Sequence, residues 1–414
     1  MRTLRTVVFW IHLVLGCLAG LVILAMSVTG VLLAFERQIN AAADAPAVLQ
    51  TESQTAAREP LQSVLAILSS NGQGVPSALV LHNSPNAPIE ARFGRERTLY
   101  LNPWTGDVIG EPSKNTRAFF GLVERIHRSL GLGMRSAFGR GATGAANLAF
   151  LFMLLSGLYL WLPKLLNLES MRTRLLFRRG IKGKARDWNW HHVVGIWTAF
   201  PLVFIVLTGV IMSYPWASNL LFTMTGSQPP ATNRGGDRPA EPARANHPAP
   251  RIGSPALQFI PLEQLAQIAK QEVPNWKSIA IEVPQPESPT LVVSIDKSVG
   301  GQPEQTSQLI INRNNGNIEE VKRFSDNTTG RKLRAWARFT HTGEEFGVIG
   351  QTIAASASLG AIVLVWTGLS MALCRARSAQ GTKTVVPDAA STQPALAAKL
   401  GSEPSLPGRG VPMH

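Results

Sequence analysis

Apolar residues in this chain are gathered into four long stretches that are separated by polar segments. The stretches cover residues 7–35, 142–162, 191–214 and 346–374. Each reaches the roughly 20 residues that a helix needs to cross a hydrocarbon core of about 30 Å. The pattern predicts a membrane protein built on a four-helix transmembrane bundle, with both chain ends on the same side. A cleavable signal peptide is disfavoured for the first stretch, because a signal's apolar core spans only about 7 to 15 residues.

The two long polar segments, residues 36–141 and 215–345, each predict a small α+β unit. In both, an amphipathic helical pattern precedes runs of alternating polar and apolar residues that are typical of antiparallel hairpins. The expected helices are 60–68 and 261–271, and the expected strands are 78–81, 89–93, 98–101, 278–283, 290–295 and 308–312. Both units close with a polar turn that contains glycine. The chain therefore reads as a duplication of helix, α+β unit and helix.

Two further segments have compositions that do not support a packed core. Residues 226–255 are dense in Pro, Ala, Gly and Arg, which predicts a flexible linker within the second unit. The tail, residues 375–414, has the same character and is expected to be disordered.

Positive charge decides the expected orientation. The chain has 40 Lys and Arg against 26 Asp and Glu, a formal net charge of +14. Basic residues are concentrated before the first stretch, in the loop 163–190 and just after the fourth stretch, all on one face of the bundle. Lys and Arg favour the cytoplasmic side, so we expect both termini in the cytoplasm and the α+β units in the periplasm of a bacterial inner membrane. The charge thus indicates membrane topology and lipid contact, not nucleic-acid binding.

Histidines recur at matched places in these stretches. His12 precedes Gly30 by eighteen residues, and His191 precedes Gly209 by the same eighteen. An imidazole in a membrane is costly without a partner, so a repeated pair at one depth points to a shared ligand, and haem is the ligand that we expect. His192 is an alternative to His191, although the repeat aligns it with an apolar residue.

A second pair of histidines, His127 and His341, precedes the second and fourth stretches at the opposite face. Imidazoles on facing helices can ligate haem iron from both sides, which suits electron transfer. Arg128 and Arg338 are candidates for contacts with haem propionates. No c-type attachment motif is present, so the two expected haems would not be covalently attached, and they would have four axial ligands that also serve as the metal ligands. These are His12, His191, His127 and His341.

Each long stretch also contains a Ser or Thr followed by Gly. We interpret these as positions where helices pack closely and leave room for a flat macrocycle. The four are Thr29–Gly30, Ser156–Gly157, Thr208–Gly209 and Thr367–Gly368.

These histidine segments and the two turn-closed units resemble the PepSY-associated transmembrane family, also called iron-regulated membrane proteins. The resemblance implies two PepSY-like domains and an inner-membrane reductase of ferric siderophores, in which the four histidines bind the haems and iron leaves as Fe(II). Some relatives carry a fused flavin and nicotinamide module. This chain has no Rossmann fingerprint, so a separate donor, a quinol or a cytoplasmic reductase, is expected.

Three alternatives stay open. The haems could serve another periplasmic acceptor, the chain could be a non-enzymatic PepSY binding or regulatory module, or the histidines could relay haem or metal as cargo. The siderophore, the donor and the oligomeric state do not follow from the sequence.

Overall fold

The computed structural model describes residues 2–48, 57–84, 86–94, 97–163, 168–229 and 259–381. Most of the predicted linker, 226–255, and the tail beyond residue 381 lie outside these ranges. Residues 1–372 form one compact unit, to which the following description applies. In the second unit, which begins at Leu373, the described part is the end of a long helix.

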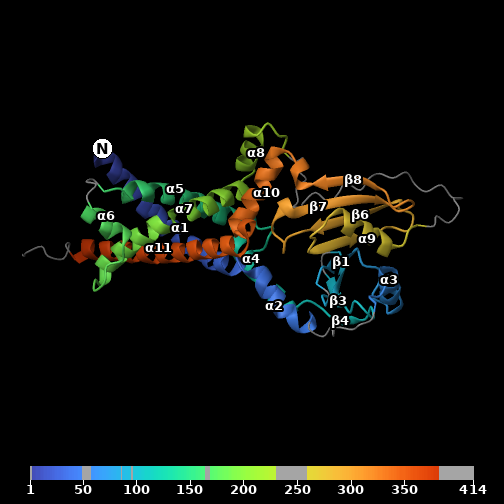
Figure 1. Ribbon diagram of the computed structural model, residues 1–414. Helices are drawn as coiled ribbons and strands as arrows, with labels where there is room; N and C mark the ends of the chain where they lie inside the picture. Colours follow the sequence, from blue (N-terminus) through green and yellow to red (C-terminus); the bar gives the residue numbers. More distant parts are fainter. Residues whose placement is uncertain are drawn as a thin grey trace, which may run out of the picture. The chain divides into compact units, whose positions relative to one another are not determined.

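Four helices in the described part of the chain are long and apolar enough to cross a membrane, which confirms the predicted number and places. They are α1 (Arg2–Leu33), α5 (Ala137–Trp161), α7 (Gly183–Ser213) and α11 (Gly347–Gly381), shown in Figure 1. Small and branched apolar side chains fill the space between them. Leu154, Val206 and Ala361 join α5, α7 and α11 in one buried cluster, and Ile23 and Met153 join α1 and α5 in another.

Eight strands form one antiparallel sheet in the order β4-β3-β2-β1-β5-β6-β7-β8. The first unit supplies β1 (Ala78–His82), β2 (Ile89–Phe93), β3 (Arg97–Leu101) and β4 (Val108–Gly110). The second unit supplies β5 (Ser278–Glu282), β6 (Thr290–Asp296), β7 (Thr306–Asn312) and β8 (Ile318–Arg323). All six predicted strands are confirmed, and β4 and β8 are additional.

The two units are joined through β1 and β5, which pair antiparallel from Ala78 with Glu282 to His82 with Ser278. The two predicted α+β units are therefore joined in a single composite sheet, and the structure does not divide them into two domains. Each of these strands would otherwise leave a row of backbone hydrogen-bonding groups unpaired at an edge, and their pairing satisfies both rows.

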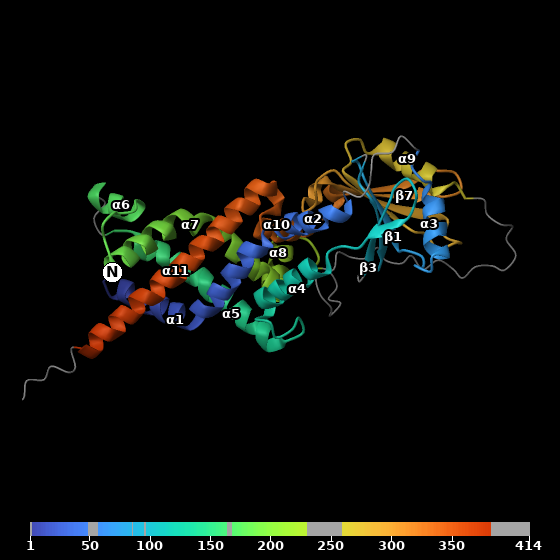
Figure 2. The same cartoon turned by 90° about the horizontal axis from the view of Figure 1, so that it is seen from below.

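One core serves both units. Helices α3 (Leu61–Ser70) and α9 (Leu262–Glu272) pack against the sheet (Figure 2), and Val64 and Leu265 share a buried cluster with strand residues of both units. The pattern along β6 alternates strictly between buried and partly buried residues, which shows that one face of the strand is turned to this core.

Both units also end with a glycine-containing turn, as predicted. Gly106 and Gly316 occupy the turns before β4 and β8 with φ of +74° and +76°. Backbone in this left-handed region favours glycine. A Cβ on Gly106 would also lie 2.7 Å from Ile67 of α3.

Further helices occupy the polar segments. The segment 163–190, expected as a loop, contains α6 and the start of α7 at Gly183. Helix α4 packs against α1 and helix α10 against α7. The connecting helices are α2 (Glu36–Val48), α4 (Lys114–Ser129), α6 (Leu168–Leu175), α8 (Pro215–Met224) and α10 (Thr329–Thr342), and the short 3₁₀ turns are η1 (Pro303–Gln305), η2 (Phe324–Asp326) and η3 (Glu344–Phe346).

Candidate functional site

The four histidines singled out in the sequence come from four different helices and meet in two pairs. His12 lies on α1 and His191 on α7, while His127 lies on α4 and His341 on α10. The rings of His127 and His341 are 6.3 Å apart between centroids, at 70° to each other. His12 and His191 hold equivalent places on α1 and α7, each seventeen residues before a Thr that contacts one of the other two histidines. We name His12 and His191 the first pair, and His127 and His341 the second pair.

The two pairs lie at different depths along the bundle. The second pair contacts Thr29 of α1 and Thr208 of α7. Thr29 is seventeen residues beyond His12, and Thr208 is seventeen beyond His191. At 1.5 Å per residue, this spacing separates the pairs by roughly 25 Å along α1 and α7.

Each histidine contacts a Ser or Thr that is followed by Gly. We call these two-residue steps the hydroxyl–glycine pairs. In every case the imidazole Nδ1 lies within hydrogen-bond distance of the hydroxyl of a neighbouring helix. The contacts are His12 with Ser156 (2.9 Å), His127 with Thr29 (2.9 Å), His191 with Thr367 (2.9 Å) and His341 with Thr208 (3.2 Å).

The glycine of each pair lies under the same ring. A Cβ at Gly157, Gly30, Gly368 or Gly209 would be 3.4, 3.6, 3.5 or 3.2 Å from Cε1 of the histidine concerned. The sequence interpretation treated these pairs as sites of helix packing and missed their contact with the histidines. The signal that could have found it is the equal number of membrane-edge histidines and Ser/Thr–Gly steps.

His192, the alternative to His191, is bonded differently. Its Nδ1 lies 2.8 Å from the carbonyl of Trp188 one turn earlier on the same helix, and its ring stacks at 4.0 Å on the Trp188 ring. It makes no contact with a hydroxyl–glycine pair among those found in the described residues. The geometry that the other three histidines share is that of His191.

The second pair lies outside the apolar spans, and its imidazoles are kept neutral. Desolvation, followed by the neighbouring His341, lowers the pKa of His127 to about 4. Desolvation also lowers the pKa of His341 from its ordinary value. Neutral imidazole is the form in which histidine ligates a metal.

The arginines named as candidates for propionate contacts have other partners in the protein. Arg128 forms an ion pair with Glu124 one turn earlier, at 2.9 Å, and Arg338 lies over the Phe339 ring at 5.5 Å from its centroid. Both stay predictions as haem contacts. Among the remaining histidines, His82 bonds Glu90 at 2.9 Å on the sheet, whereas His247 and His414 lie outside the described residues.

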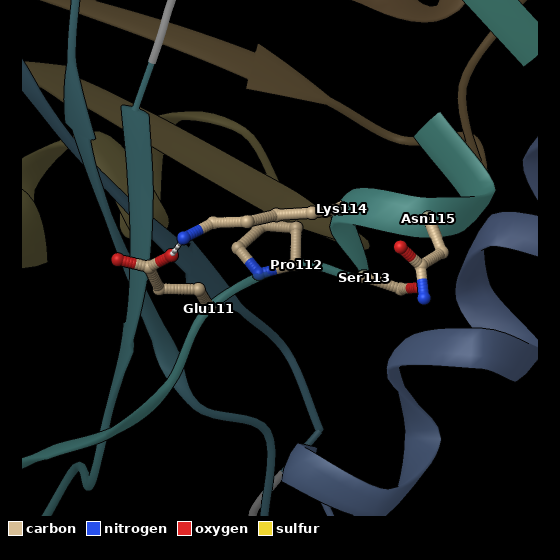
Figure 3. Close-up of a pocket in the computed structure, with 5 residues that line it drawn as sticks. All are labelled: Glu111, Pro112, Ser113, Lys114 and Asn115. Carbon is tan, nitrogen blue, oxygen red and sulfur yellow. Dashed lines mark ion pairs between the residues drawn. The ribbon is translucent and has the colours of Figure 1, made fainter. Parts of the chain in front are cut away.

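A shallow surface pocket of about 370 Å³ lies where β4 leads into α4. Glu111 and Lys114 form an ion pair of 2.6 Å across one side of it, and the Asn115 side chain points away from that pair (Figure 3). None of the four histidines lines it. The pocket therefore adds nothing to the histidine pairs.

The donor set fits haem. In the described part of the chain, no group of three or more His, Cys, Asp or Glu converges in a way that could hold a metal ion. Two imidazoles that ligate one metal from opposite sides at about 2.0 Å have centroids roughly 6 Å apart, and the second pair shows 6.3 Å. Two histidines per site match the number of protein ligands that a haem bound on both sides would take.

A family model described as the PepSY-associated TM region matches residues 9–375 of the 414-residue chain. The protein belongs to this family. No curated protein matches the chain.

Proposed function

We propose that the protein is a membrane-bound di-haem b oxidoreductase that passes electrons across the inner membrane to a ferric siderophore in the periplasm. The first pair of histidines, His12 and His191, would hold one haem, and the second pair, His127 and His341, the other. The observation that carries the proposal is the fourfold repeat of one arrangement. Each imidazole is fixed through Nδ1, and Nε2 has no hydrogen-bond partner among the described residues.

Bound b-type haem supplies reversible one-electron storage at its iron. Each pair of histidines would hold one such haem between two imidazoles, a ligand set that suits electron transfer rather than oxygen chemistry. The separation of about 25 Å along α1 and α7, compared with a hydrocarbon core of about 30 Å, supports positions of the two pairs toward opposite faces of the membrane. Two relay points at these depths suit transfer of electrons across the membrane.

The reaction at the outer face is a one-electron reduction. Fe(III) held by a siderophore gains one electron and becomes Fe(II), which hard oxygen chelators hold far less tightly. No proton transfer, nucleophile or covalent intermediate is needed, so a catalytic triad is not expected. The electron comes from a separate donor, a quinol or a cytoplasmic reductase.

The proposed orientation rests on charge. The segment between α5 and α7 and the N-terminal turn of α1 carry clusters of Lys and Arg, which favour the cytoplasmic side. Both termini would then be cytoplasmic, and the composite sheet would lie in the periplasm. The second pair would be the one nearer the siderophore.

The test is the visible spectrum of the detergent-purified protein from cells supplied with haem, oxidised and dithionite-reduced, with haem counted per chain. We expect two low-spin b-type haems that reoxidise when a ferric siderophore is added to the reduced protein. Two haems that stay reduced would support electron transfer to a different acceptor. A colourless protein would refute the proposal and favour a binding or regulatory module.

A further inference from the structure

The hydroxyl–glycine pairs have a direction of hydrogen bonding that can be read from their own helices. Each hydroxyl already donates its proton to a carbonyl one turn earlier. Thr29 donates to Ala25 at 2.7 Å, and Ser156 donates to Met153 at 3.3 Å. The equivalent bonds in the other two helices run from Thr208 to Phe204 and from Thr367 to Val363, both 2.7 Å. The hydroxyl oxygen is left as an acceptor toward the histidine.

An acceptor at Nδ1 requires that the imidazole carries its proton there. His341 gives the clearest case, because its Nδ1 also lies 2.8 Å from the carbonyl oxygen of Ile205, which can only accept. A neutral imidazole with its proton on Nδ1 has its lone pair on Nε2. All four histidines are thereby set in the same tautomer.

We propose that the hydroxyls of the four hydroxyl–glycine pairs are positioning residues for the haem ligands. Each hydroxyl fixes the proton of its histidine on Nδ1, and at Gly209, where a Cβ would be 3.2 Å from His341, the glycine also leaves room for the edge of the ring. This inference rests on the proposed function, because it assigns a role toward the haems named there. The pairs act through the histidines, and none of them is proposed to touch the iron.

The arrangement also crosses between helices in a fixed way. His127 of α4 contacts the hydroxyl on α1, and His12 of α1 contacts the hydroxyl on α5. In the same way, His341 of α10 contacts the hydroxyl on α7, and His191 of α7 contacts the hydroxyl on α11. Each spanning helix thus carries one hydroxyl–glycine pair. Orientation of both axial ligands is built into the packing of the bundle and does not depend on the surface arginines.

A hydrogen-bond partner at Nδ1 would affect the redox potential of the haem iron as well as the orientation of the imidazole ring. A hydrogen bond from Nδ1–H raises the basicity of the ligating nitrogen and favours Fe(III) over Fe(II), and loss of such partners typically costs 10- to 100-fold in metal affinity. If one hydroxyl is removed, we expect about a tenfold weaker preference for Fe(III) at that haem. A tenfold change is 59 mV for a one-electron couple, so the midpoint potential should rise by about that amount.

The experiment uses the full-length haem-loaded protein and redox titration of its visible spectrum. Thr29→Val removes the hydroxyl partner of His127 at constant volume and leaves the Met26 carbonyl as a second partner. Thr367→Val does the same for His191 and leaves the Leu364 carbonyl. We expect each variant to shift the potential of one haem upward and leave the other unchanged. Thr29→Ser, which keeps the hydroxyl, should retain the native potentials and so separates loss of the bond from loss of packing.

Thr352→Val is the matched control. Thr352 lies on α11 and bonds the carbonyl of Val348 at 2.8 Å, as the four hydroxyls bond theirs, but it is exposed and contacts no histidine. It should leave both potentials unchanged. Unchanged potentials in both Val variants of a protein that holds two haems would overturn the positioning role and leave the proposed function standing. A shift in Thr29→Ser as large as in Thr29→Val would overturn it too, and a haem-free wild-type protein would overturn both proposals.

Discussion

The two halves of the molecule repeat one scheme but pack it differently. We call α1, α2, α4 and α5 the first half, and α7, α8, α10 and α11 the second half. Nine residues before its hydroxyl–glycine pair, α5 carries Asn147, and α11 carries Ser358 at the same spacing. Each of these reaches across to the other half, Asn147 to Gly209 and Ser358 to Gly30.

Of these two contacts between the halves, the one between Asn147 and Gly209 is the tighter. Asn147 donates to the carbonyl of Val206 at 3.0 Å, and a Cβ on Gly209 would be 2.9 Å from its amide nitrogen. A Cβ on Gly30 would meet only ordinary contacts, at 3.6 Å from both His127 and Ser358. The histidine geometry has been kept through the duplication, whereas the packing around it has diverged.

The halves also differ in how their connecting helices are fixed. In the first half, α2 is held by Asp44, which bonds Arg117 at 2.7 Å and accepts from Tyr100 at 2.9 Å. In the second half, α8 is held by Phe222, which is buried against Gly330 of α10. An ionic network holds one helix, and apolar packing holds the other.

The largest expected effect comes from removing a histidine. His12→Ala should leave one haem per chain instead of two, and His341→Ala should do the same at the other site, because an iron with one axial imidazole is held weakly. Haem quantification against protein gives the ratio. His192→Ala is the control that keeps two haems, and a loss of haem in that variant with retention in His191→Ala would reverse the assignment.

Asp44→Ala tests the ionic helix contact. Asp44 is buried but the Arg117 side chain is 41% exposed, so removing the carboxylate should cost less than the roughly 3 kcal/mol of a fully buried pair, and the effect should be confined to α2. Amide hydrogen exchange should show lost protection in α2 and unchanged protection in α8. Glu111→Gln, which breaks an exposed ion pair, should leave both helices protected.

The contrast between the ionic contact of α2 and the apolar contact of α8 also predicts that the stability of α2 depends on pH. Burial opposes ionisation of Asp44, but hydrogen bonds from Arg117, Ser113 and Tyr100 outweigh it and lower its pKa below the ordinary value of 3.8. The stabilisation is therefore fully present above pH 3.8 and is lost as the pH falls through the lower folded value. In hydrogen exchange at decreasing pH, α2 should open before α8, and simultaneous opening would contradict the comparison.

Gly209→Ala should have an intermediate effect. The added methyl group displaces the Asn147 amide from its bond to Val206 and presses on His341, and overpacking of this kind costs about 1–3 kcal/mol. Unfolding of the purified protein in detergent should show the loss, together with a perturbed spectrum of one haem. An unperturbed spectrum would mean that His341 does not depend on this contact.

Gly30→Ala should have the smallest effect. Its Cβ finds ordinary contact distances, and alanine is favoured over glycine inside a helix by about 1 kcal/mol. We expect unchanged or slightly higher stability in the same unfolding measurement. A loss as large as that of Gly209→Ala would show that the two halves are packed alike after all.

Much of this architecture follows from local patterns in the sequence. Long apolar stretches predict membrane helices because backbone groups in a lipid core must be satisfied within the segment. The alternation in β1 and β6 and the turns at Gly106 and Gly316 are equally local, and the eighteen-residue repeat matched His12 with His191 before any contact was known. Helices such as α2 and α8 were not predicted, because Asp44 and Phe222 are fixed by partners distant in the chain.

The sequence by itself determined which segments span the membrane, where strands and turns fall and that the chain is duplicated, because each depends on neighbours in the chain. Only the tertiary structure decided that β1 pairs with β5 to merge two units into one sheet, since the sequence does not specify which strand edges meet. It alone decided that His127 lies on Thr29 and His341 on Thr208. Those contacts join residues 98 and 133 positions apart, and they arise from how the helices pack against one another.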